Sequence, residues 1–275
     1  MTAVIWELDF FSRPVLDSNN KKIWELLICN SDRSWQFVQI CPGDRVNSEW
    51  LAEQLQVALQ TAPLPIKVRF FRPSMNNIIV RGCKLAGLTA QASRRVFTLA
   101  QWLQARMETV YAEQPGFQAI DPLPLKLLPM PNPQPIPSAL MGEKWITASL
   151  AAAEFSEADQ WQIDFGELFT LNLPEATPVP GIIIYSRRAT PLSAWMSGAD
   201  PVFLSFSESI SQAQLILDAG GETRWNLATV TNGKAIADAK NFENTKLTAK
   251  GVHFLAIQAS AESTNFAGFW LLQTV

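Results

Sequence analysis

Hydrophobic and polar positions alternate with a period of two over the first forty residues, which is typical of β-strands with one buried face. Strands are predicted at 3–11, 22–29 and 34–41, with turn-forming residues between them. Ser12-Arg13-Pro14 is expected to close or bend the first strand. Because the connections are short, the chain should open with an antiparallel meander.

From residue 47 the apolar spacing changes to three and four residues, the period of an amphipathic helix. Three helices are predicted, and they alternate with two short strands, 66–71, which is rich in β-forming residues, and 88–92. The expected caps and stops of these helices are Asn47 or Ser48, residues 62–65, Ser74, Gly87 and Ser93.

Right-handed crossovers place the fourth and fifth strands parallel to the first, in one mixed sheet with helices on its faces. The fold class is therefore α/β, with α+β mixed sheets. The order of three antiparallel strands followed by helix-strand-helix-strand-helix is similar to the ribonuclease-H-like fold. That similarity is one of topology, and it carries no function by itself.

Eight prolines fall between Gln114 and Pro137, and they predict an extended, semi-rigid linker over residues 113–140. It separates an N-terminal α/β domain, 1–112, from a C-terminal domain, 141–275. The second half is also interpreted as α/β. Its predicted strands are 144–151, 160–169, 181–185, 202–206, 213–217, 223–230, 253–259 and 266–273, and its predicted helices are 191–196 and 232–244.

Composition is that of a globular protein, with 48% hydrophobic residues, 17% charged residues and ten tryptophans in 275 residues. Cys29, Cys41 and Cys83 lie in apolar surroundings and are interpreted as reduced core residues. The single histidine, His253, lies in an apolar run and is expected in the core. With no CxxC motif, neither a metal site nor a cofactor is expected. No membrane span or targeting segment is found, which favours a soluble cytoplasmic protein.

Charge is distributed unevenly along the chain. Residues 1–112 carry 13 basic and 9 acidic residues, a net of +4, and residues 113–275 carry 9 and 16, a net of −7, which together give the total of −3. Between Glu53 and Glu108 there is no acidic residue. The cations of this acid-free block are Lys67, Arg69, Arg72, Arg81, Lys84, Arg94, Arg95 and Arg106. Such a block indicates an anion-binding surface, with nucleic acid as the largest ligand class, or else a solvated basic face without a ligand.

Two positions make the anion-binding interpretation specific. Arg94 and Arg95 follow the expected Ser93 cap, where a helix N-terminus disfavours added positive charge unless an anion is bound. Arg69 and Arg72 end a strand beside two phenylalanines that can stack on bases, although strand alternation assigns one of the two to the core. The predicted RNA-binding set is Lys67, Arg69, Phe70, Phe71, Arg72, Arg81, Lys84, Arg94 and Arg95.

Two carboxylates of the first strands are also compatible with an enzyme. Asp9 and Glu25 lie where a ribonuclease-H-like nuclease places carboxylates for two metal ions. The fourth strand, however, ends in arginines where such an enzyme needs another carboxylate, and no other common catalytic motif is present. A non-catalytic protein is therefore expected. Its pI of about 5.3 disfavours broad duplex binding and leaves room for a confined single-stranded RNA site.

Several segments resemble the Tab-two-like family of cyanobacteria and plastids, from about residue 4 to residue 273. They are 6–15, which includes Trp6, Asp9 and Arg13, then 22–28, 41–44, 69–72, 93–95 and 266–272. The chain lacks the transit peptide of plastid members and so is similar to a cyanobacterial homologue, cytoplasmic or peripheral to thylakoid membranes.

The resemblance implies an RNA-binding translation factor that favours A/U-rich RNA. It would act on a messenger 5′ leader to support synthesis of photosystem reaction-centre subunits, chiefly those of photosystem I, together with translation or photosystem-assembly proteins. Trp270-Leu271-Leu272 matches the family's functional tripeptide. Read from its own residues, the tripeptide is a buried strand whose loss acts through folding. The alternatives are a protein-interaction scaffold for photosystem assembly and a metal-dependent nuclease using Asp9 and Glu25.

Overall fold

The computed structural model describes residues 4–118, 131–208 and 213–274. The chain divides into two compact units, Met1–Leu127 and Leu128–Val275. The described ends of the predicted linker are each tied to a unit, because Phe117 forms a β-bridge with Val15, and Gln134–Pro135 pairs with a strand of the second unit. Residues 119–130 of that linker lie outside the described residues.

The first unit contains a five-stranded sheet in the order β3-β2-β1-β4-β5. Its strands are β1 (Ile5–Leu16), β2 (Lys22–Asn30), β3 (Gln36–Cys41), β4 (Lys67–Phe70) and β5 (Ala90–Ala92). The first three pair antiparallel, and β4 and β5 run parallel to β1, as the element order predicts. β1 continues through Pro14 because its register with β2 shifts between Ser12 and Leu16, where proline's missing N–H is tolerated.

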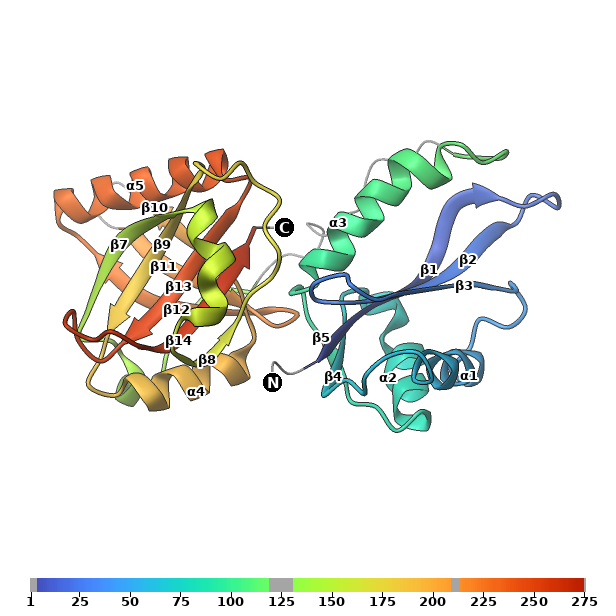
Figure 1. Ribbon diagram of the computed structural model, residues 1–275, viewed down its shortest axis with the longest axis horizontal. Coiled ribbons are helices and arrows are strands. Elements are labelled where there is room, and N and C mark those ends of the chain that lie inside the picture. The colour runs from blue at the N-terminus through green and yellow to red at the C-terminus, as the bar shows by residue number, and fades with distance from the viewer. Residues whose placement is uncertain (1–3, 119–130, 209–212, 275) are drawn as a thin grey trace. The chain divides into compact units, whose positions relative to one another are not determined.

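Helices α1 (Ser48–Ala58) and α2 (Asn76–Leu85) cover one face of this sheet, and α3 (Phe97–Arg106) crosses the other (Figure 1). The predicted Asn47 cap is confirmed, since its side chain accepts a hydrogen bond from the Trp50 amide at 2.8 Å. A 3-10 turn, Pro73–Met75, precedes α2 and displaces its start beyond Ser74. Gly87 ends α2 with a φ of +77°, as expected of a glycine stop.

The expectation that Ser93 caps the third helix is wrong. Ser93 Oγ accepts a hydrogen bond from the Arg95 amide at 2.9 Å, and the Ser93 amide donates to the Phe70 carbonyl at 2.8 Å. Both groups are therefore used in a turn that extends from β5. The helix begins at Phe97, so Arg94 and Arg95 precede it and do not occupy its first turn. A π-helical turn, Met107–Tyr111, follows α3.

The second unit contains two sheets, ordered β7-β9-β13-β14-β8 and β10-β11-β12-β6. Their strands are β6 (Gln134–Pro135), β7 (Lys144–Ala151), β8 (Ile163–Glu167), β9 (Pro178–Tyr185), β10 (Pro201–Glu208), β11 (Ala213–Ala219), β12 (Thr223–Val230), β13 (Val252–Gln258) and β14 (Phe266–Gln273). Helices α4 (Ala189–Ala199) and α5 (Gly233–Thr248) join them, and 3-10 turns lie at Ser138–Leu140 and Ala152–Gln160. The last of these turns shortens the strand predicted at 160–169.

Both faces of the five-stranded sheet in the second unit are buried. Trp270 and Leu272 of β14 point into a core shared with the four-stranded sheet, α4 and α5, and Leu271 points into a second core on the opposite face. All three side chains are at most 2% exposed. The interpretation of this tripeptide as a buried strand is therefore confirmed.

Strand β10 lies at an edge, and side chains from other elements bond its backbone. His253 Nε2 accepts from the Leu204 amide at 2.7 Å, and Lys246 Nζ donates to the Leu204 carbonyl at 2.8 Å. Glu243 accepts from the Phe206 amide, two residues further along the same edge, at 2.8 Å. His253 is fully buried, which confirms its prediction as a core residue. Among the described residues, no helix combines the length and the apolar character needed to cross a membrane.

Candidate functional site

The structure separates the predicted RNA-binding set into buried and surface residues. Arg69, Phe70 and Arg95 are at most 2% exposed, so these three do not lie on the surface. Lys67, Phe71, Arg72 and Arg94 are half-buried, and Arg81 and Lys84 are exposed.

The same set is also divided between the two faces of the sheet. Phe70 packs in the core beneath α1 and α2, so strand alternation directs Arg69 to the face that α3 crosses. Arg81 and Lys84 lie on α2, which covers the opposite face. The prediction of one converging basic face is therefore replaced by a smaller group on the α3 side.

Several cations of the acid-free block form ion pairs with acidic residues from other parts of the sequence. Arg72 pairs with Asp9 of β1, Arg106 with Glu25 of β2, and Arg81 with Glu49 of α1. The pairing of Arg81 is on the surface, where it contributes little to stability. The other two pairs belong to a buried network on the α3 face.

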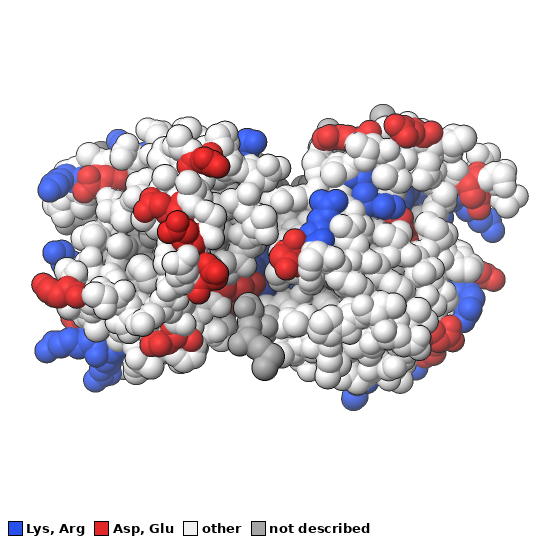
Figure 2. Space-filling view, viewed as in Figure 1, with Lys and Arg blue, Asp and Glu red and all other residues white. Residues whose placement is uncertain are grey.

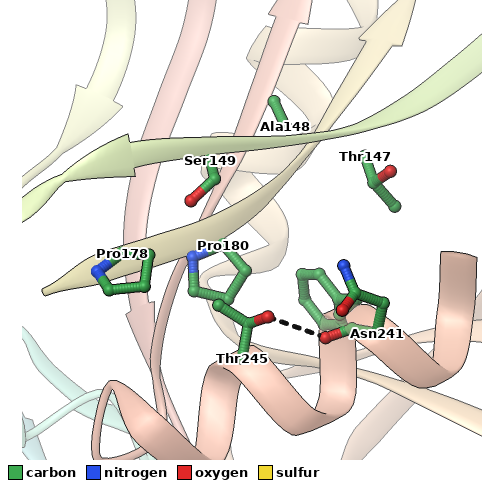
Figure 3. Close-up of a pocket in the computed structure, with 8 residues that line it drawn as sticks. Thr147, Ala148, Ser149, Pro178, Pro180, Asn241 and Thr245 are labelled. Carbon is green, nitrogen blue, oxygen red and sulfur yellow. Dashed lines mark hydrogen bonds between the residues drawn. The ribbon is translucent and has the colours of Figure 1, made fainter.

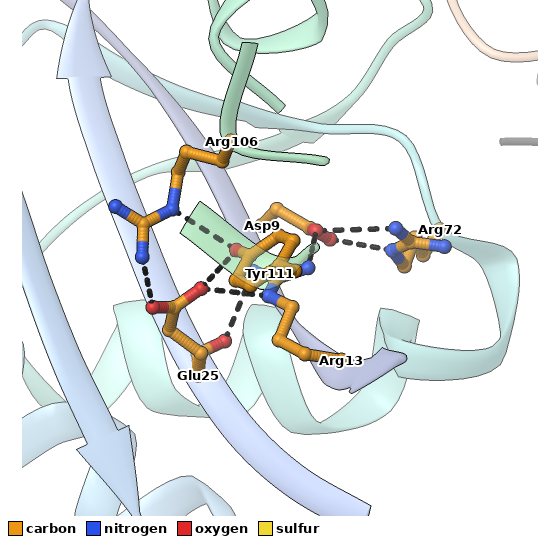
Figure 4. Close-up of polar contacts among 6 residues, drawn as sticks. All are labelled: Asp9, Arg13, Glu25, Arg72, Arg106 and Tyr111. Carbon is orange, nitrogen blue, oxygen red and sulfur yellow. Dashed lines mark hydrogen bonds and ion pairs between the residues drawn. The ribbon is translucent and has the colours of Figure 1, made fainter. Parts of the chain in front are cut away.

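Five charged side chains of this network alternate in sign, in the order Arg106, Glu25, Arg13, Asp9, Arg72 (Figure 4). Arg13 Nη1 lies 2.7 Å from Asp9 Oδ2, and Arg13 Nε lies 2.9 Å from Glu25 Oε2. Arg72 Nε and Nη2 donate to the two oxygens of Asp9 at 2.6 and 3.2 Å. The three inner side chains, Glu25, Arg13 and Asp9, are at most 4% exposed. A buried chain of this kind fixes the orientation of its outer members.

Ionisation in the network follows from these contacts. Burial by itself raises the pKa of Asp9, but the Arg13 and Arg72 guanidinium groups outweigh it and hold that pKa below its usual value. Tyr111 donates its hydroxyl proton to Glu25 and accepts from Arg106 Nε at 3.0 Å. Burial, reinforced by Glu25, raises the pKa of Tyr111 to about 12. Tyr111 is therefore neutral at physiological pH.

The two outer arginines, Arg72 and Arg106, reach the surface. Their side chains are 14% and 15% exposed, and neither Nη1 group has a hydrogen-bond partner in the described part of the chain. The Arg72 guanidinium lies over the rings of Phe11 and Phe71, at 4.0 and 4.7 Å from their centroids. Each outer arginine is thus held on one side and offers N–H groups on the other.

The network carries surplus positive charge, since three guanidinium groups face two carboxylates, a formal net of +1. In the space-filling view, Lys and Arg atoms of the first unit gather beside α3 (Figure 2). A phosphate would bring both charge and hydrogen-bond acceptors to such a site. The α3 side of the sheet is therefore the candidate anion site.

Asp9 and Glu25 have little capacity left for a metal ion. Both oxygens of Asp9 accept hydrogen bonds from guanidinium groups, and both oxygens of Glu25 accept from Arg106, Arg13 or Tyr111. A metal ion would have to displace these cations. This geometry disfavours the nuclease alternative.

Sequence reasoning missed Arg106, Phe11 and Tyr111 as members of the site. Strand alternation gives a signal for this network. Asp9 and Arg13 share one face of β1, and a buried face with two charged residues indicates an ion-pair network and not an ordinary apolar core. Arg106 follows as a cation on the helix that crosses that face. Tyr111 has no comparable signal, because it reaches the network through the π-helical turn.

The second unit contributes a different kind of feature. Uncharged side chains of β7, β9 and α5 surround a hollow of about 400 Å³ (Figure 3). The residues are Thr147, Ala148, Ser149, Pro178, Pro180, Asn241, Phe242 and Thr245.

Elsewhere in this unit Arg187 pairs with Glu143, and Arg188 donates to the Ala139 carbonyl, so both arginines fasten a turn.

The fold and the site define an α/β protein whose candidate anion site consists of two surface arginines held by buried carboxylates. Family models cover most of the chain, "RNA-binding protein Tab2/Atab2 N terminal" at residues 5–106 and "RNA-binding protein Tab2/Atab2, C-terminal domain" at residues 124–273. The chain belongs to the Tab2/Atab2 family of RNA-binding proteins.

Curated relatives agree with this membership. The chain is 40% identical to "Protein TAB2 homolog, chloroplastic" of Arabidopsis thaliana, over 97% of this chain and 74% of the relative. Identity to the Zea mays protein of the same name is also 40%, over 97% and 70%. A chain of the simian T-cell lymphotropic virus intasome, solved in complex with PP2A regulatory subunit B56 gamma, matches 82% of this chain and 78% of its own at 11% identity. The TM-score is 0.32, which is too low to indicate a shared fold.

Residues that carried the family resemblance lie in structural positions. Trp6 is fully buried and stacks on Trp35 at 4.9 Å between ring centroids. Asp9 and Arg13 form the centre of the ion-pair network. Trp270, Leu271 and Leu272 are core residues of β14. These residues therefore act by building the units and by orienting the surface arginines.

Proposed function

We propose that this protein binds A/U-rich single-stranded RNA in the 5′ leader of a messenger and supports translation and biogenesis of photosystem reaction-centre subunits, chiefly those of photosystem I. Membership in an RNA-binding family supports the ligand class. The finer target follows from the resemblance of the sequence motifs. A cyanobacterial, cytoplasmic protein acting close to thylakoid membranes is part of the same proposal.

The ion-pair network is the observation that carries this proposal. Arg72 and Arg106 are the phosphate-binding residues, and buried Asp9 and Glu25 are positioning residues that hold them. Phe11 and Phe71 hold the Arg72 guanidinium in place through cation–π contacts and offer ring surface to a base. Lys67 and Arg94 supplement the positive charge on this side, while Arg69, Phe70 and Arg95 support it from within.

The test is a double variant, Arg72→Gln with Arg106→Gln, measured for binding to A/U-rich RNA over a range of salt concentrations. Loss of two phosphate contacts should lower the slope of log affinity against log salt by about 1.4. Affinity at low salt should fall by about tenfold or more for each arginine. Thermal unfolding identifies variants that fail to fold.

The matched control is Arg81→Gln with Lys84→Gln, which removes two exposed cations from α2. This control should change binding much less than the Arg72 and Arg106 variant. Arg72→Lys provides a second check. It keeps the positive charge, but lysine cannot bind both oxygens of Asp9 and also present an N–H group to the ligand, so RNA affinity should still fall. A folded Arg72 and Arg106 variant with wild-type affinity and salt slope would sink the assignment of the site.

A further inference from the structure

Strand β3 forms one edge of the sheet in the first unit, and in the described residues its outer side pairs with no other strand. Its sequence, Gln-Phe-Val-Gln-Ile-Cys, contains no charged residue and no proline. Its register with β2 is continuous from Gln36 to Cys41, so no bulge bends the strand away. Backbone N–H and C=O groups along this edge therefore form a regular template for another strand.

Other strand edges in the chain carry the protections that β3 lacks. β10 has its amide and carbonyl groups bonded by side chains, as described above. β8 contains two acidic residues, β7 begins with an exposed lysine, β5 has three residues, and β6 has two, one of them a proline. Charge, shortness and proline are the usual means by which proteins prevent edge pairing. Among the described edge strands of five or more residues, β3 is the one without any of these protections.

Apolar side chains are exposed on the same strand. Val38 is 37% exposed and Ile40 is 57% exposed, and strand periodicity places both on one face of β3. An edge template flanked by exposed apolar side chains gains both backbone hydrogen bonds and apolar contact when a second strand is added.

We propose that β3 pairs antiparallel with β3 of a second copy of this chain. With Gln39 opposite Gln39 of the partner subunit, Val38 lies opposite Ile40 of the partner subunit, and the same contact recurs on the other side of the two-fold axis. The strand is its own complement in this register. Because it carries no charge, the symmetry axis repeats no like-charge contact. The two five-stranded sheets join into one sheet of ten strands, five from each copy.

The pairing edge and the anion site share the α3 face of the sheet, because Ile40 of β3 lies directly opposite Glu25 of β2, which holds Arg106. Arg72, the other outer arginine, follows β4 on the far side of β1. Dimer formation is therefore measured without RNA, so that its loss in Ile40→Lys is scored separately from any change in RNA affinity.

Sedimentation velocity of the full chain, from low to high micromolar concentration, tests the proposal. A reversible shift from 30.6 kDa toward twice that mass is expected. Ile40→Lys should abolish the shift, because the symmetry would set two introduced charges near each other across the axis. Ile66→Lys is the matched control, since Ile66 is 61% exposed and lies outside the strand. Unchanged thermal unfolding verifies that both variants fold.

A cysteine at the axis tests the strand register. Gln39→Cys should form an intermolecular disulfide under mild oxidation, because directly opposed residues have Cβ atoms about 4.5–5.5 Å apart. Ile66→Cys should form none, and Cys29, Cys41 and Cys83 are buried. A wild-type chain that stays monomeric overturns the proposal, as does a dimer lost equally in Ile66→Lys. A monomer whose β3 captures an added extended apolar peptide also overturns it and assigns the edge to another protein.

Discussion

At the scale of single residues, burial decides what a charged side chain can do. Arg69, Arg72 and Arg95 come from the same acid-free block, yet only Arg72 reaches the surface with N–H groups to spare. Asp9 holds two nitrogen atoms of Arg72, and two phenyl rings flank its guanidinium group, so this side chain is fixed before a ligand binds. Fixing a long side chain in advance reduces the entropy lost on binding.

Tyr111 gives a pH prediction at this scale. The folded state raises the pKa of its phenol to about 12, so its contribution to the free energy of unfolding is complete below about pH 10 and is lost as pH rises through about 12. The chain has two tyrosines, so Tyr185→Phe leaves Tyr111 as the only phenol. Near-ultraviolet absorbance of that variant should show a midpoint near 12. A midpoint near 10 would contradict the hydrogen-bonded, buried phenol.

At the scale of elements, close packing of neighbouring strands selects glycine at particular positions. A Cβ atom on Gly181 of β9 would lie 2.2 Å from the Phe254 ring of the adjacent strand β13. The Phe254 ring has no room to move away from such a Cβ atom, because it is 1% exposed and packs in a core. The β9–β13 pair therefore depends on the absence of a side chain at this position.

Gly181→Ala should lower the free energy of unfolding by about 1–3 kcal/mol, as expected for overpacking in a core. Gly198→Ala is a matched control in α4, because a Cβ there meets nothing within 4 Å. That control should be neutral or stabilising by about 0.4–1 kcal/mol. Urea unfolding of both variants measures the difference. Equal effects of the two substitutions would show that β9 and β13 are not packed as described.

At the scale of the whole molecule, each unit has its own cores, and charge is distributed unevenly between the two halves of the chain. The proposed anion site lies in the unit that contains the acid-free block. Trp270, Leu271 and Leu272 lie in the other unit and fill its cores. Their loss is therefore expected to lower the stability of the second unit.

Trp270→Ala should lower the stability of the second unit by about 3–5 kcal/mol, the range for large aromatic side chains removed from a core. RNA affinity per folded molecule should stay close to that of the wild type under conditions where the variant remains folded. Leu247→Ala, at a residue 76% exposed, serves as the control and should stay within about 0.5 kcal/mol. A folded Trp270→Ala variant that has lost RNA binding would instead place the tripeptide in the binding surface.

Local sequence patterns determined much of the fold. The strand meander, the two parallel strands, the Asn47 cap, the Gly87 stop and the buried terminal hairpin all follow from apolar period and turn chemistry. These features depend on neighbours within a few residues, and such neighbours are visible in a sequence. The prediction that Ser93 caps the third helix was wrong, because a serine hydroxyl can accept a hydrogen bond in a turn as readily as at a helix N-terminus.

The tertiary structure alone decided which cations face solvent and which acids accompany them. The partners in the network are separated by 63 residues for Asp9 and Arg72 and by 81 for Glu25 and Arg106. A charge block along the chain therefore says how much positive charge is present, and only the packing of α3 over the sheet decides where that charge is exposed. Ion pairing depends on distance in space, and the sequence records only distance along the chain.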